Sequence, residues 1–165
     1  MEVIGPPDIH HLNAAAGWLG LGAPADAAEE LDRIHPGLQG HPDVLAVRWQ
    51  LFATQKRWEE ALQVARNLVD ASPMSSCGWV DQSFALHELR RTAEAREKLM
   101  LVSERFHDVL VIPYNLACYC CQLGDESEAR AWLHRAVQVG GRDEVRTMAL
   151  ADPDLEPLWG WIRKW

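Results

Sequence analysis

The chain has 165 residues, of which 48% are apolar, and a formal charge of −8 at neutral pH, which suits a compact domain or short repeat array rather than a disordered segment. The acidic balance argues against nucleic acid as the main partner, because phosphate binding needs clustered Lys and Arg. No apolar run approaches the ~20 residues of a membrane span, and the first residues lack a signal-peptide pattern, so we expect a cytoplasmic protein without a membrane partner.

Amphipathic stretches, with apolar residues three and four positions apart, predict a succession of helices. Breakers such as Gly22, Pro73 and Gly140 separate these stretches, and Asp125 is placed to cap the start of the eighth helix. In chain order we expect helices at 8–21, 25–34, 42–55, 57–71, 75–89, 91–106, 110–122 and 126–139, then a terminal pair near 142–149 and 154–164.

The alanines Ala27, Ala61, Ala95 and Ala129 follow one another at intervals of 34 residues. They define four windows without insertions, 8–41, 42–75, 76–109 and 110–143. In the second window the run 49–73 contains Phe52, Trp58 and Pro73, and in the fourth the run 115–136 contains Leu116, Gly124 and Ala136. With these residues at this period, the sequence resembles tetratricopeptide repeat (TPR) proteins.

The resemblance covers about 8–141 and implies an all-α fold, a right-handed superhelical solenoid of antiparallel helix pairs. We expect an N-terminal tail at 1–7, four pairs (8–41, 42–75, 76–109, 110–141) and a capping segment at 142–165. The sequence departs from the family pattern at several positions. Lys56 and Arg90 replace the turn glycine, Arg48 and Gln82 stand at usually apolar positions, and Ser83 replaces a small apolar residue.

In TPR stacks the first helix of each pair lines a concave groove, so the resemblance implies a partner-binding face. Mapped onto this sequence, that face holds Leu12, Ala16 and Leu19 in window one, Asp43, Ala46, Gln50 and Ala53 in window two, Cys77, Val80, Phe84 and His87 in window three, and Val111, Tyr114, Cys118 and Cys121 in window four.

The mapped face is apolar and carries no Lys or Arg. TPR domains that bind the C-terminal carboxylate of chaperones use basic groove residues, so we do not expect that ligand class. An apolar or aromatic-bearing segment fits better, with Phe84 and Tyr114 as its anchors. In the alternative, several of these side chains pack beneath the C-terminal segment and bind nothing.

The C-terminal stretch 142–165 does not continue the period. It resembles the closing segment of TPR stacks, with a turn at 152–155 and apolar mass from Trp159 and Trp161. We expect a cap over the last apolar face, and the alternative is a tryptophan-rich docking tail that ends at Trp165.

Catalytic and metal-binding patterns are absent from the sequence. His87-Glu88 begins like a zinc protease helix but lacks the second histidine, and no phosphate-binding glycine loop occurs. Cys118 and Cys121, with Cys77 or His87, are better explained as small packing side chains than as metal ligands. We expect no cofactor, no metal and no enzymatic activity.

The leading functional hypothesis is therefore a protein-protein interaction module, an adaptor or scaffold. The alternatives are a small acidic TPR chaperone for a secreted client and a structural subunit of a larger complex. The sequence leaves the oligomeric state open, with a monomer favoured.

Overall fold

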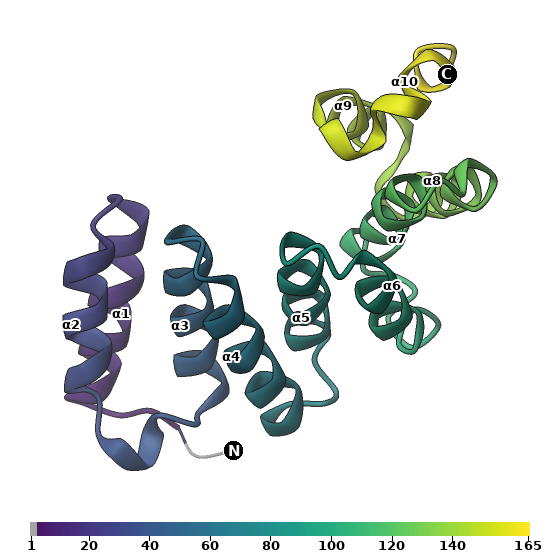
Figure 1. The fold of residues 1–165 in the computed structure, drawn as a ribbon. Coiled ribbons are helices and arrows are strands. Elements are labelled where there is room, and N and C mark those ends of the chain that lie inside the picture. Colours follow the sequence, from purple (N-terminus) through teal and green to yellow (C-terminus); the bar gives the residue numbers. More distant parts are fainter. Residues whose placement is uncertain (1–2) are drawn as a thin grey trace. The chain divides into compact units, whose positions relative to one another are not determined.

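The computed structural model describes residues 3–165, so the first two residues of the predicted tail lie outside it. The described chain is helical and divides into two compact units, one ending at Ala85 and one running from Leu86 to Trp165. Its α-helices are α1 Asp8–Gly20, α2 Pro24–Arg33, α3 Pro42–Thr54, α4 Trp58–Ala71, α5 Ser76–Glu88, α6 Thr92–Met100, α7 Val111–Gln122, α8 Glu126–Gly140, α9 Arg142–Ala151 and α10 Trp159–Ile162 (Figure 1).

Successive helices pack as pairs, as the 34-residue period predicts. Within the first unit α1 packs on α2 and α3 on α4, and within the second α7 packs on α8. The four alanines that define the period, Ala27, Ala61, Ala95 and Ala129, have no exposed surface. A small side chain at these positions lets the two helices of a pair approach closely, which explains their regular spacing.

The turn inside each pair uses one left-handed residue. Gly22 and Gly124 have φ angles of 73° and 83°, and the residues at the same period, Lys56 and Arg90, have φ angles of 55° and 63°. The repeat therefore keeps its turn conformation even where the glycine is lost. A side chain in this region of φ is strained, because its Cβ crowds the backbone.

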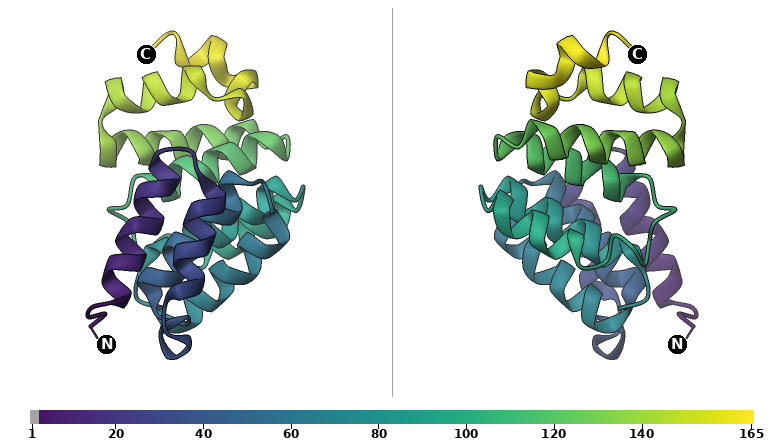
Figure 2. Two further views of the ribbon diagram at one scale, coloured as in Figure 1. Left: turned by 90° about the vertical axis from the view of Figure 1, so that its left-hand side faces the viewer. Right: turned by 90° about the vertical axis from the view of Figure 1, so that its right-hand side faces the viewer.

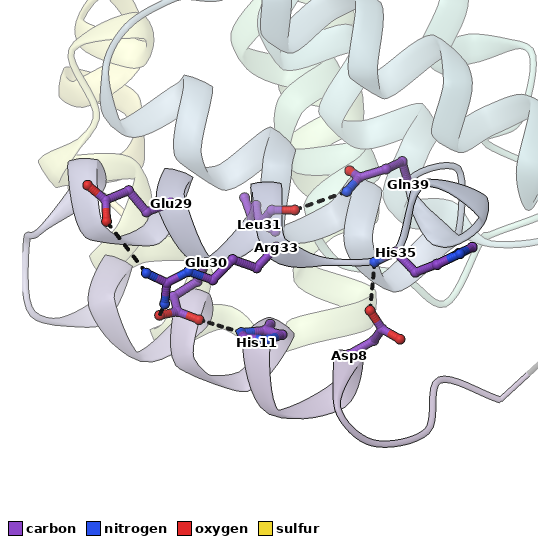
Figure 3. Close-up of polar contacts among 8 residues, drawn as sticks. All are labelled: Asp8, His11, Glu29, Glu30, Leu31, Arg33, His35 and Gln39. Carbon is purple, nitrogen blue, oxygen red and sulfur yellow. Dashed lines mark hydrogen bonds and ion pairs between the residues drawn. The ribbon is translucent and has the colours of Figure 1, made fainter.

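Polar contacts fasten the first helix pair (Figure 3). His11 Nδ1 on α1 lies 2.7 Å from Glu30 Oε2 on α2, and the Asp8 carboxylate accepts a hydrogen bond of 2.6 Å from the backbone N–H of His35. The Gln39 side-chain amide donates to backbone carbonyls at the end of α2. The two Gln39 hydrogen bonds satisfy carbonyl groups that the helix end leaves unpaired.

Two predicted helices, the sixth and the terminal one, are wrong in their extent. The sixth was expected to reach residue 106, but α6 ends at Met100 and turns follow to residue 108. There the Ser103 hydroxyl donates to the Met100 carbonyl, and backbone bonds shorten to the i→i−3 type at Val102. A short 3-10 helix, η1 Pro36–Leu38, also lies between α2 and α3.

The predicted terminal helix at 154–164 is split. A 3-10 helix, η2 Pro153–Leu158, precedes the four-residue α10. Pro157 lies within η2 and has no N–H to donate, so a regular α-helix cannot run through this position. The break lets Leu155 and Leu158 both point into the core, where neither retains exposed surface.

The C-terminal segment covers the last helix pair of the second unit. α9 folds back beside α8, α10 packs on α9, and η2 packs on α7 (Figure 2). Trp159 Nε1 donates to the Ala149 carbonyl at 2.8 Å. The edge of Trp161 meets His134 on α8, and Trp165 stacks on the same imidazole. These contacts support the proposal that the segment caps the last helix pair.

Candidate functional site

The predicted partner-binding face divides sharply between the two units. In the first unit Ala16 on α1 and Gln50 on α3 are exposed, and Ala53 and Val80 are partly buried. Phe84 on α5 has 37% of its surface exposed. Leu12 differs from these, because it is buried in the core of the first helix pair. We call the first set, Ala16, Gln50, Ala53, Val80 and Phe84, the inner face of the first unit.

Phe84 is held by two tryptophans. Its ring centroid lies 6.3 Å from that of Trp49 on α3 and 5.8 Å from that of Trp58 on α4, both in edge contacts. The start of α5 is equally close to α4: a Cβ at Gly78 would lie 2.9 Å from the backbone nitrogen of Val69. This packing fixes the direction of α5, and with it the exposed ring of Phe84.

A carboxylate lies one turn before Phe84 on the same helix. Asp81 is partly buried, and desolvation by that burial raises the pKa of its carboxyl to about 7. Residues at i and i+3 of a helix share a face, so Asp81 lies on the same face of α5 as Phe84. Asp81 was not among the site residues predicted from the sequence. The 34-residue period was the available signal, because polar residues, Asn13 and Asn115, stand at two of the equivalent positions.

In the second unit the predicted site residues lie beneath the C-terminal segment. Tyr114, Cys118 and Cys121 on α7 are buried, with 6%, 4% and 5% of their surfaces exposed, and His87 retains 9%. The chain itself therefore fills the face that these four residues were expected to offer a partner. This outcome is the alternative arrangement that the sequence left open, and it applies to the second unit.

Two aspartates of the C-terminal segment make the contacts. Asp152 Oδ2 accepts hydrogen bonds from the Tyr114 hydroxyl at 3.0 Å and from the Cys118 thiol at 3.5 Å. Asp154 Oδ2 lies 2.9 Å from His87 Nε2, whose other ring nitrogen lies 3.0 Å from the Thr92 hydroxyl. Asp152 also caps η2 by accepting from the Asp154 N–H, which agrees with its predicted place in a turn.

Burial and these carboxylates suppress ionisation of the covered side chains. Burial, with Asp152 nearby, raises the pKa of the Cys118 thiol well above its ordinary value, and burial also raises the pKa of Cys121. For Tyr114 burial and then the neighbouring Cys118 and Asp152 raise the hydroxyl pKa. Protonated thiols are poor nucleophiles, and this agrees with the small packing role that the sequence suggested for these cysteines.

Neither a metal centre nor a membrane span is found in the described part of the chain. No group of three or more His, Cys, Asp or Glu side chains there is arranged to hold a metal ion. Between residues 3 and 165, no helix combines the length and apolarity needed to cross a bilayer.

Comparison with known proteins establishes the fold. No protein-family model and no curated protein matches the sequence. Solved structures do match. Pseudomonas aeruginosa PilF has a TM-score of 0.75 at 17% identity over 95% of this chain and 69% of its own. MamA from Desulfovibrio magneticus RS-1 has a TM-score of 0.73 at 16% identity, over 98% of this chain and 94% of its own.

A third matching structure is described as a TPR protein. TTC0263, a TPR protein of Thermus thermophilus, matches with a TM-score of 0.68 at 16% identity, over 94% of this chain and 95% of its own. The chain thus has the helix-pair fold of TPR proteins. At these identities the likeness describes the fold alone.

Proposed function

We propose that the chain is a protein-binding module whose partner docks on the inner face of the first unit. One observation carries the proposal. Phe84 and Cys118 stand 34 residues apart at the same place in the repeat, yet Phe84 is 37% exposed and Cys118 is covered by the C-terminal segment. The same register position is thus left open in the first unit and closed in the second.

An exposed aromatic residue that two tryptophans hold in place is suited to anchor a partner. Aromatic side chains contribute much of the binding energy at protein interfaces when they enter a desolvated pocket of the other protein. Phe84 needs little ordering on binding, because Trp49 and Trp58 already restrict its ring. Val80, one turn before Phe84 on α5, is partly buried, and Ala16 and Ala53 are small side chains of the same inner face, which suits an apolar segment.

The test compares two glutamate substitutions. The wild-type chain, Phe84→Glu and Leu21→Glu are used as baits in a lysate of the source cells, and captured proteins are identified by mass spectrometry. Leu21 is 77% exposed in the turn after α1, outside the inner face, so it matches the change in charge and apolarity. We expect one partner to be lost with Phe84→Glu and retained with Leu21→Glu.

Hydrogen exchange then locates the contact. Bound to the captured partner, amides of α3 and α5 are expected to exchange more slowly than in the free chain, with α8 and α9 unchanged. A partner that survives Phe84→Glu, or protection confined to the second unit, would refute the proposed surface. Circular dichroism of each variant excludes unfolding as the cause.

A further inference from the structure

The first unit carries most of the negative charge of the chain. Residues 1–85 contain eleven acidic and five basic side chains, a net charge of −6 out of the total of −8. A field of this sign attracts cations and repels acidic segments during an encounter. The charge alone identifies no site, but it favours a basic partner for any surface within this unit.

Asp81 places one of these acidic groups one helical turn before Phe84, where its carboxylate makes no contact in the described chain that stabilises the fold. No hydrogen bond or ion pair to its carboxylate exists within residues 3–165, although the residue is partly buried. Burial without a partner disfavours its ionised form, which is why its pKa rises to about 7. The equivalent positions of the other windows, Asn13, Val47 and Asn115, are uncharged. A cation from outside the chain would supply the missing partner.

The aromatic rings nearby can receive the same cation. A Lys or Arg within about 6 Å of an aromatic ring centre is attracted to the ring face. Trp49 and Trp58 meet Phe84 in edge contacts. Phe52, which packs against the same buried cluster as Trp49, already has a cation on its ring: the Arg57 guanidinium lies 4.6 Å from the ring centre and is paired with Glu60.

We propose that the inner face of the first unit binds a segment in which a Lys or Arg adjoins an apolar side chain. The cation meets Asp81 and the ring of Phe84, and the apolar side chain packs beside Val80 and Ala53. This inference rests on the proposed function and adds the chemistry of the partner. It excludes acidic segments, since Asp81 would repel them.

The experiment selects peptides from a phage-displayed library of random 12-residue sequences against the wild-type chain and against Phe84→Glu. Peptides that bind only the wild type are expected to combine Arg or Lys with Leu, Phe or Trp. The tightest of them is then measured by fluorescence polarisation against Asp81→Asn and Asp70→Asn. Asp70 is an exposed acid of the same unit, on α4, so its variant makes the same charge change away from Phe84.

We expect Asp81→Asn to weaken binding of this peptide about 5- to 10-fold, where a tenfold change in Kd corresponds to about 1.4 kcal/mol. Asp70→Asn should weaken binding less than about twofold. Equal weakening by both variants would overturn the inference, because it would show that the overall negative charge of the unit, and not Asp81 itself, attracts the peptide. Phe84-dependent peptides without basic residues would overturn the inference alone and leave the proposed function intact. A selection that yields no Phe84-dependent peptide would overturn both.

Discussion

At the scale of single residues, two features of this chain run against local stability. Lys56 and Arg90 adopt the left-handed turn that glycine fills at Gly22 and Gly124. Asp81 is a partly buried acid with a raised pKa. Stability is lost at both kinds of position, but for different reasons. The turn residues are strained by their own Cβ atoms, whereas Asp81 lacks a partner for its charge.

The turn strain predicts a stabilising substitution. Lys56→Gly should raise the free energy of unfolding by about 0.5–1 kcal/mol, because relief of the left-handed strain exceeds the added freedom of the unfolded chain. Urea denaturation measures this change. The matched control is Gln55→Gly, one residue earlier at a φ of −84°, which should destabilise. A loss of stability in both variants would contradict the strain argument.

The raised pKa of Asp81 predicts a pH dependence. The folded chain holds this proton more tightly than the unfolded chain, so the contribution of Asp81 to stability is complete below about pH 4 and is lost as the pH rises through about 7. Asp81→Asn removes the effect. Relative to wild type, the variant should be more stable by about 1–2 kcal/mol at pH 8 and nearly equal at pH 4. Thermal unfolding at the two pH values measures the difference, and a difference independent of pH would contradict it.

At the scale of elements, the C-terminal segment decides which helix faces remain available. Its aspartates pair with Tyr114, Cys118 and His87, and its leucines Leu155 and Leu158 are fully buried. We propose that the segment acts as a cap, because a helix pair cannot cover its own apolar face. Its contacts cover the face of α7 that carries Tyr114 and Cys118.

Removal of one buried side chain of the cap tests this covering role. Leu155→Ala should reduce the free energy of unfolding by about 2–4 kcal/mol. It should also speed the reaction of Cys118 with iodoacetamide, because the thiol is shielded by the segment that Leu155 anchors. Cys77 is exposed and serves as the internal control, with the same labelling rate in wild type and variant. Peptide mass spectrometry reports each site, and unchanged labelling of Cys118 would contradict the cap.

At the scale of the whole molecule, the chain is a series of helix pairs in two compact units. Each pair in such a series is stabilised by its neighbours, so a destabilising substitution affects mainly the pairs next to it. The first unit has its own buried cluster, which includes Leu31 and Val44, and in the second unit the C-terminal segment packs on α7 and α8. The proposed binding surface therefore lies in the first unit, and the C-terminal segment packs within the second.

Hydrogen exchange under native conditions tests this locality. Leu31→Ala should accelerate exchange of amides in α1–α4 and leave α8 and α9 little changed, because Leu31 is fully buried in the first unit. Leu155→Ala should give the opposite pattern. Uniform acceleration along the chain in both variants would indicate a single cooperative unit instead.

The sequence by itself determined the helix pairs, because their signals are local. Ala27 and its three equivalents mark the close contacts, and the turn position is fixed by the period even at Lys56 and Arg90, where the glycine is missing. The Asp125 cap of α8 was predicted on the same basis and is confirmed by its hydrogen bond from the Glu128 N–H. Spacing along the chain contains all of this information.

Only the tertiary structure decided which mapped side chains remain exposed. Phe84 and Cys118 occupy equivalent positions, and nothing in their neighbouring residues says that one is open and the other covered. The difference arises because η2, which follows Cys118 by more than 30 residues, returns to pack on α7. Such a contact depends on where Pro157 breaks the last helix and how Leu155 is buried, and these are consequences of packing in three dimensions.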